Sequence, residues 1–376
     1  MRTLAALYLG LISGTSADGI DVALARFARR PRLLAAATYA YPAGLRERIL
    51  AVAQGDGRIS LDELGALDVE IGRAFADAAG RLLARERLAP DAIRALGSHG
   101  QTIRHRPSGA APYTMQLGDP NVIAERTGIA TVADFRRRDV AAGGHGAPLA
   151  PAFHAAMLAR DASTRVVLNL GGIANITVLS GDAGRPLRGF DTGPASCLLD
   201  AWAERHRGTP YDAGGAFAAS GRVDTILLER LLADPYFAAP PPKSTGREVF
   251  HLRWLEPHLA GRAIAAEDVQ ATLLALTART VADAIRAHAP DAREVYACGG
   301  GVHNPVLMRA IGDALAPLPL ASVAALGIDP DFVEAMTFAW LARERVARRA
   351  APNVDSVTGA RGPRVLGAVF HGATRR

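Results

Sequence analysis

The chain has 376 residues, 49% of them hydrophobic and 21% charged, a composition typical of a globular protein and not of a disordered one. Its net charge is +6, but basic and acidic residues are mixed along the chain, which argues against a nucleic-acid partner. Two cysteines give no disulfide framework, which fits a reducing cytoplasm, and no apolar run is long enough for a membrane span. A chain of this length usually forms two domains.

The first part of the chain predicts strands around a glycine-rich turn, followed by helices. Hydrophobic runs favour strands at Leu4–Ile12, Val22–Phe27 and Leu33–Tyr41, as in an antiparallel meander. The first run resembles a short signal peptide, but only one positive charge precedes it and it leads into a second strand, so we favour a strand. Helical spacing of apolar residues covers Leu45–Ala53 and Leu61–Arg87.

A short strand at Ile93–Gly97 is followed by a polar stretch. A helix is expected to begin at Pro120, because proline is favoured at the first helical position. Ile129–Ala133 has the pattern of another strand, and Gly143–Gly146 breaks the pattern.

After that break a strand, a glycine turn and a strand occur again, at Arg165–Leu170, Gly171–Asn175 and Ile176–Ser180. The recurrence suggests an internal duplication. A further strand, Val295–Ala297, precedes three consecutive glycines. Helices are predicted up to Trp202 and at Arg222–Ala233, Asp268–Ala287, Asn304–Leu315 and Asp331–Arg345.

The loop after the first strand is a candidate phosphate site. Its glycines let backbone N–H groups approach an anion, and its hydroxyl groups add donors. Asp18 is suited to holding a hydrated Mg²⁺ beside phosphates. An ordinary surface turn is an equally good interpretation of the composition alone. The loop comprises Ser13, Gly14, Thr15, Ser16, Ala17, Asp18, Gly19, Ile20 and Asp21.

Two later glycine clusters have related properties. Gly171 and Gly172 follow a buried strand and permit close backbone approach to a ligand, and Asn175 adds a side-chain amide. Gly299, Gly300 and Gly301 stand between a strand and a helix and could form a surface for a nucleobase or ribose. The alternative for Gly299–Gly301 is a plain connector, with the following helix capped by Asn304.

These turns match neither the Walker pattern nor the dinucleotide fingerprint. Their arrangement is similar to that of actin/hexokinase-like (RNase H-like) ATPases, α/β proteins in which hairpins from two related domains with mixed sheets hold the phosphates of ATP. We therefore expect one domain at residues 1–140 and a second at 141–376, with the C-terminal segment packing back on the first.

Asp191 is the candidate general base. It should end a strand, and Thr192, Gly193 and Pro194 should form a fixed turn after it. A carboxylate in such a position can deprotonate an attacking hydroxyl or water. The alternative is that Asp191 caps the next helix.

A polar cluster in the first half is suited to binding a sugar, because its side chains are hydrogen-bond donors and acceptors. Arg136 could pair with a carboxylate of the substrate. His99 and His105 lack a convincing third ligand for a metal. The candidate sugar-binding residues are Ser13, His99, Gln101, Thr102, Arg136 and Asp139.

With these motifs in place, the chain resembles the anhydro-N-acetylmuramic acid kinases over nearly its whole length, in the family's order. The matching stretches are SGTSADGID (Ser13–Asp21), SHGQTIRHRP (Ser98–Pro107), the run Gln116–Pro151, LNLGGIANIT (Leu168–Thr177), GFDTGPAS (Gly189–Ser196), PPKSTGREVF (Pro241–Phe250), CGGGVHNP (Cys298–Pro305) and DFVEAMTFAWLA (Asp331–Ala342).

The resemblance implies that ATP, water and 1,6-anhydro-N-acetylmuramic acid give N-acetylmuramic acid 6-phosphate and ADP. It implies that Asp191 deprotonates the water, that Glu334 helps to position it, and that the enzyme is a cytoplasmic recycler of cell-wall sugars, often a homodimer. Residue by residue, the family usually has Asn where Ser196 stands and commonly Gln where His145 stands. The family motif also contains Lys243, the only lysine in the chain, whose role the sequence does not explain.

Two other functions are compatible with the same fold. A kinase for an ordinary sugar would use Asp191 to deprotonate a substrate hydroxyl, without consuming water. A binding protein switched by ATP, like the chaperones of this fold, would hydrolyse ATP without making a sugar phosphate.

Overall fold

The computed structural model describes residues 6–28, 31–55, 58–159, 163–182, 184–247 and 249–372. The chain divides into two compact units, the first formed by Met1–Met157 with Phe332–Arg376 and the second by Leu158–Asp331. The boundary placed at 140/141 from the sequence falls within α4 (Phe135–Ala141).

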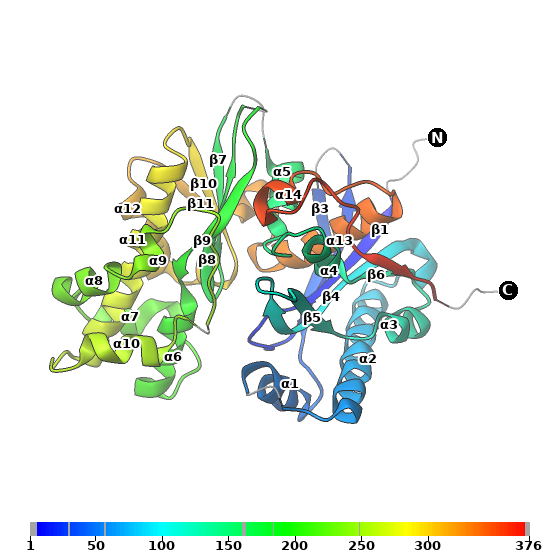
Figure 1. Ribbon diagram of the computed structural model, residues 1–376, viewed down its shortest axis with the longest axis horizontal. Coiled ribbons are helices and arrows are strands. Elements are labelled where there is room, and N and C mark those ends of the chain that lie inside the picture. The colour runs from blue at the N-terminus through cyan, green and yellow to red at the C-terminus, as the bar shows by residue number, and fades with distance from the viewer. Residues whose placement is uncertain are drawn as a thin grey trace. The chain divides into compact units, whose positions relative to one another are not determined.

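The first unit is built on a mixed sheet with strand order β12-β6-β4-β1-β2-β3, and β5 pairs with β4 (Figure 1). The pairs β1/β2 and β2/β3 are antiparallel, which confirms the predicted meander, and β4 runs parallel to β1. Residues Leu4 and Ala5 of the predicted first strand lie outside the described residues. The strands are β1 (Leu7–Ser13), β2 (Ile20–Phe27), β3 (Pro31–Tyr39), β4 (Ile93–Arg106), β5 (Tyr113–Leu117), β6 (Thr131–Ala133) and β12 (Ala368–Phe370).

Strand β4 corrects the sequence analysis, which ended a strand at Gly97. The strand continues to Arg106 and pairs with β5, which the sequence did not predict. Its polar residues predicted no strand, yet Gln101 is fully buried there. A buried amide is tolerated because Tyr41 Oη donates to its Oε1 (3.0 Å) and its Nε2 donates to the Gly14 carbonyl (3.0 Å).

Local sequence signals explain the helix boundaries of this unit. Ser60 caps α2 by accepting a hydrogen bond from the Glu63 amide (3.1 Å), and Asp119 caps α3, in which Pro120 takes the predicted first position. The helices are α1 (Leu45–Gln54), α2 (Leu61–Arg85), α3 (Pro120–Thr127), α4, α5 (Ala150–Leu158), α13 (Val333–Val346) and α14 (Val354–Thr358), with a 3₁₀ turn at η1 (Pro90–Ala92).

Helix α13 packs directly on the sheet at two neighbouring glycines. Gly10 of β1 and Gly97 of β4 are register partners. A Cβ at Gly10 would overlap the carbonyl oxygen of Ala335, and one at Gly97 would overlap that of Phe338. The helix backbone can therefore lie against β1 and β4 only because both positions lack a side chain.

The second unit repeats the strand order of the first. Its sheet has the order β11-β10-β7-β8-β9, which matches β6-β4-β1-β2-β3. In both sheets a meander is followed by a strand parallel to its first member. This agreement supports the predicted duplication. The strands are β7 (Arg165–Leu170), β8 (Ile173–Leu179), β9 (Arg188–Pro194), β10 (Glu294–Cys298) and β11 (Leu320–Ser322).

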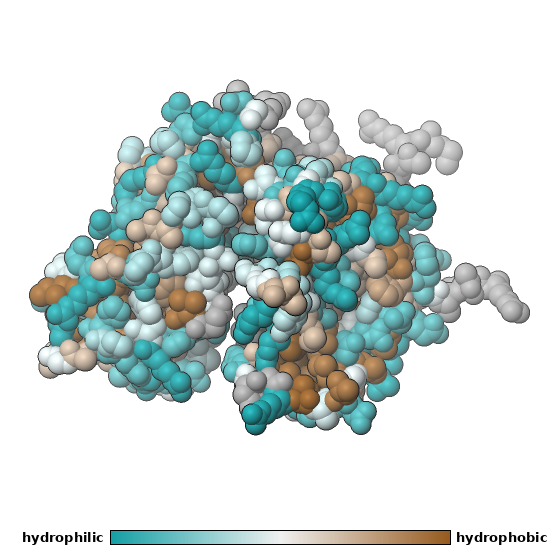
Figure 2. Space-filling view, in the orientation of Figure 1, coloured by the Kyte–Doolittle hydropathy of each residue, from teal (hydrophilic) through white to brown (hydrophobic). Residues whose placement is uncertain are grey.

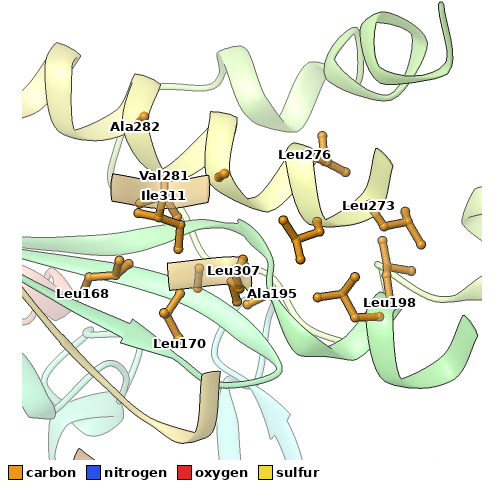
Figure 3. Close-up of a cluster of buried hydrophobic side chains, with 14 of the residues drawn as sticks. Leu168, Leu170, Ala195, Leu198, Leu273, Leu276, Val281, Ala282, Leu307 and Ile311 are labelled. Atoms are coloured by element: carbon orange, nitrogen blue, oxygen red, sulfur yellow. The ribbon is translucent and has the colours of Figure 1, made fainter. Parts of the chain in front are cut away.

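The core of the second unit fixes the end of β7. Figure 3 shows Leu168 and Leu170 of β7 in one apolar cluster with Leu307 and Ile311 of α12, all almost fully buried. Burying a leucine side chain stabilises a fold by about 1.5–3 kcal/mol. The helices are α6 (Ser196–Arg207), α7 (Ala216–Ser220), α8 (Thr225–Leu232), α9 (Pro235–Ala238), α10 (Leu252–Leu259), α11 (Ala266–His288) and α12 (Pro305–Leu315), with 3₁₀ turns at η2 (Ala213–Gly215), η3 (Gly300–His303), η4 (Val323–Leu326) and η5 (Pro330–Phe332).

Hydrophilic residues cover much of the face seen in Figure 2, and hydrophobic ones gather where Figure 1 places α1 and α2. Among the described residues, the helices are too short or too polar to cross a membrane.

A buried histidine predicts how stability depends on pH. Burial lowers the pKa of His154 in α5 to about 3, so below pH 6.5 the unfolded chain binds a proton that the folded chain does not. When the pH falls from 7 to 5, we expect the titration of His154 to lower the free energy of unfolding of the wild type by about 2 kcal/mol. The free energy of unfolding of His154→Gln should fall by about 2 kcal/mol less over the same range. Urea unfolding at both pH values measures the difference.

The exposed His251 supplies the control, since His251→Gln should follow the wild type. Equal losses in wild type and His154→Gln would contradict the prediction.

Candidate functional site

In the first unit, the loop Ser13–Asp21 joins β1 to β2 and is held by neighbouring side chains. Ala17 adopts a positive φ of 52°, and its amide donates to the Gly14 carbonyl (3.1 Å). Arg46 Nη2 donates to Asp18 Oδ1 (2.8 Å) and to the Ser16 carbonyl (3.2 Å). The loop is thus a fixed, tight turn, and an arginine stands beside it as a possible further contact for an anion.

The side chains of the neighbouring residues Gln101 and Thr102 form hydrogen bonds with different parts of the first unit. Gln101 links Tyr41 to the Gly14 carbonyl, so it supports the loop from within the unit. Thr102 Oγ1 accepts a hydrogen bond from Gln116 Nε2 (3.2 Å).

The neutral His99 and the charged groups Arg136 and Glu334 form a polar cluster in the first unit. Arg136 Nε donates to His99 Nε2 (2.8 Å), and His99 Nδ1 donates to the Gly100 carbonyl (2.9 Å). Burial and the adjacent Arg136 hold the pKa of His99 well below its usual range, so the ring is neutral. Burial lowers the pKa of Arg136 to about 10, an effect opposed by Glu334 and Asp139.

Glu334 lies in the first turn of α13 and keeps solvent access. Desolvation by the surrounding protein nevertheless raises the pKa of its carboxyl group, and the positive charge of Arg136 opposes that rise. The sequence pattern alone did not single out Glu334; the family resemblance did.

Both carboxylate oxygens of Asp139 accept hydrogen bonds from neighbouring segments of the chain. Its side chain is 1% exposed, Thr358 Oγ1 donates to its Oδ1 (2.8 Å), and the Gly146 amide donates to its Oδ2 (2.7 Å). Arg136 Nη1 in turn donates to the Gly146 carbonyl (2.7 Å). Asp139 therefore orients the loop that orients Arg136. His145 lies in this loop, where its amide donates to the Thr358 carbonyl (2.8 Å).

In the second unit, Asp191 lies within β9 and not at the end of a strand, as the sequence suggested. Its carboxylate Oδ2 accepts a hydrogen bond from the Thr245 amide (2.9 Å), and its register partner is Asn175 of β8. The capping interpretation is wrong, because the N-cap of α6 is Ala195 and no side chain caps that helix. The two carboxylates Asp191 and Glu334 thus belong to different units.

The glycine turn between β7 and β8 is shorter than the predicted Gly171–Asn175, because β8 already begins at Ile173. The Gly171 carbonyl accepts from the Ser196 amide (3.1 Å), and the Gly172 carbonyl accepts from the Ala195 amide (3.0 Å). The contact at Ser196 is made by its backbone, so it does not depend on the departure from the family's asparagine. The turn is tied to the start of α6.

Arg247 is a residue that the sequence reasoning missed. A Cβ at Gly172 would lie 3.0 Å from its Nε, so its guanidinium covers the turn. Its place in the matching stretch Pro241–Phe250 was the available signal.

The third glycine cluster lies where β10 ends, next to the end of the parallel strand β7. Gly299 has φ 82°, and a Cβ there would lie 2.5 Å from Asn169 Oδ1. Gly300 faces open space. The segment forms the 3₁₀ turn η3, and Asn304 caps α12, a cap that is compatible with both the nucleotide surface and the connector. Ligands of open α/β sheets bind at such carboxyl ends of parallel strands.

Two sheets of one strand order, each with a glycine-rich hairpin turn after its first strand, define the fold class of the actin/hexokinase-like proteins. A family model described as anhydro-N-acetylmuramic acid kinase matches residues 6–372, and the chain belongs to this family.

Named relatives are similar over almost their whole length. The chain is 58% identical to an anhydro-N-acetylmuramic acid kinase of Xanthomonas axonopodis pv. citri (strain 306), over 97% of this chain and 98% of the relative. It is 54% identical to one of Xylella fastidiosa, over 97% and 96%. Among solved structures, a glucokinase of the ROK family from Streptomyces griseus aligns with a TM-score of 0.39 and 13% identity, over 90% of this chain and 99% of that one.

Proposed function

We propose that this protein is an ATP-dependent kinase that converts 1,6-anhydro-N-acetylmuramic acid and water to N-acetylmuramic acid 6-phosphate, in the recycling of cell-wall sugars. The observation that carries the proposal is the position of Asp191. It is a carboxylate oriented by the Thr245 amide, in the unit that holds two of the glycine turns, within a chain similar to named kinases along its length. The proposal includes the homodimeric state and the cytoplasmic location that the family resemblance implies.

In the proposed reaction Asp191 removes a proton from water as the water attacks the anomeric carbon. The bond from that carbon to O6 breaks, and O6 attacks the γ-phosphorus of ATP; the bond from that phosphorus to the β-phosphate oxygen breaks, and ADP leaves. Glu334 helps to position the water. A carboxylate suits this role because the anomeric carbon becomes oxocarbenium-like as the bridge opens.

Arg136 is the proposed partner of the substrate carboxylate. His99 and Gly146 fix its guanidinium, so the direction of the cation is set before any ligand binds. A planar guanidinium can pair with a carboxylate through two parallel hydrogen bonds.

The phosphates of ATP are assigned to the backbone amides of the turns Gly14–Gly19 and Gly171–Gly172, with Arg247 as an additional cation. Among the described residues, His, Cys, Asp and Glu form no group of three that could hold a metal. This fits a Mg²⁺ bound mainly by phosphates and water, with the exposed Asp18 as an outer contact. The ion would neutralise phosphate charge.

The test is a reaction with Mg-ATP, 1,6-anhydro-N-acetylmuramic acid and ¹⁸O-labelled water, analysed by mass spectrometry. The proposal predicts a sugar phosphate with label at the anomeric hydroxyl, above the exchange measured on the finished product. A sugar phosphate without that label would indicate a simple sugar kinase. ADP release with no sugar phosphate would overturn the kinase assignment for this substrate.

A further inference from the structure

The single lysine of this chain lies in a half-buried loop beside Asp191. Lysine and arginine together number 43, and only Lys243 is lysine. A chain that uses arginine almost everywhere else retains one ammonium here.

The ammonium of Lys243 binds the end of α9. Its Nζ donates to the carbonyl of Tyr236 (3.0 Å) and to that of Phe237 (3.2 Å), and it lies 4.7 Å from the centre of the Tyr236 ring. Burial lowers the pKa of Lys243, and the nearby Asp191 opposes this effect. The ammonium donates in three directions from one atom, whereas the donors of a guanidinium lie in a plane.

The same loop and helix hold Asp191 at three points. The Asp191 amide donates to the Lys243 carbonyl (3.2 Å), and the Thr245 amide donates to Asp191 Oδ2 (2.9 Å). Tyr236 Oη donates to the Asp191 carbonyl (2.7 Å). Lys243–Thr245, here called the support loop, thus fixes both the backbone and the carboxylate of Asp191.

We propose that Lys243 is a positioning residue, whose ammonium fastens the support loop to α9 and so holds the Asp191 carboxylate in its reactive orientation. The inference rests on the proposed function of Asp191. Without the ammonium, the Tyr236 and Phe237 carbonyls lose their shared donor and the support loop loses its attachment. Small displacements of a reacting group can cost a large factor in rate.

The test compares Lys243→Met with wild type and with a restored ammonium. Lys243→Met keeps an unbranched chain and should lower kcat at least about tenfold, with the KM for ATP changed less than about threefold, because the glycine turns are untouched. Alkylating Lys243→Cys with 2-bromoethylamine gives a thioether lysine analogue, which should recover most of kcat. Wild type treated in the same way controls for Cys197 and Cys298, both buried.

Arg253→Met removes one positive charge from an exposed position of α10 and should leave kcat unchanged. A kcat of Lys243→Met within about twofold of wild type would overturn the inference while leaving the proposed function intact. A fall in kcat with a matching loss of thermal stability, not recovered by the lysine analogue, would assign Lys243 to folding alone. Wild type that makes no sugar phosphate would overturn the proposed function, and this inference with it.

Discussion

Asp191→Asn should lower kcat by a factor on the order of 10²–10⁴, the range that general-base catalysis typically contributes. Asparagine has the shape of aspartate, and its side-chain oxygen can still accept the hydrogen bond from the Thr245 amide (2.9 Å in the wild type). It cannot take a proton from water at neutral pH. The variant should therefore fold and bind ATP normally while failing at the chemical step. Steady-state kinetics, ATP titration and thermal unfolding measure the three quantities.

Asp283→Asn is the matched control. It removes one carboxylate from the surface of α11 in the same unit, where Asp283 pairs with Arg279 and Arg286. Exposed pairs of this kind contribute little to stability, so its activity and stability should stay near those of wild type. Turnover of Asp191→Asn within about tenfold of wild type would show that another group is the base.

The sequence predicted the repeated part of the fold well, because that part depends on local patterns. The meander and the strand–turn–strand unit at Arg165–Ser180 follow from runs of apolar residues separated by glycines, and both sheets contain them. Adjacent glycines that interrupt an apolar run mark a turn locally, so the turn at Gly171–Gly172 could be located without knowledge of its partners.

The sequence failed where a residue's role depends on distant partners. Gln101 belonged to a polar stretch that predicted no strand, but it is buried in β4, where Tyr41, 60 residues away, donates a hydrogen bond to its amide oxygen. Asp191 looked like a possible helix cap, but the Thr245 amide, 54 residues away, holds its carboxylate. Arg247 lies in a stretch that matches the family, but nothing in the sequence pattern assigned it a role until the fold placed it over Gly172. The roles of the candidate site residues stay predictions that the experiments above test.

Gly97→Ala should destabilise the first unit more than any single surface change. A methyl group at this position would overlap the Phe338 carbonyl and lie 3.1 Å from Ala342 Cβ, so α13 must move away from β4. Overpacking of this kind typically costs about 1–3 kcal/mol, and more when the obstacle is backbone. The same shift would displace Glu334, which lies at the start of α13. The free energy of unfolding, measured in urea, and kcat should therefore both fall in this variant.

Gly80→Ala separates this clash from the general effect of adding a methyl group. Gly80 is exposed in α2, and a Cβ there meets nothing within 4 Å. Alanine is the better helix former by about 0.8–1 kcal/mol, so this control should be slightly more stable than wild type and equally active. Gly97→Ala as stable as Gly80→Ala would show that α13 does not need direct contact with β4. If Gly97→Ala lowered kcat but kept the stability of the wild type, α13 would be able to move without unfolding the unit. The fall in kcat would then measure how closely the reaction depends on the position of Glu334.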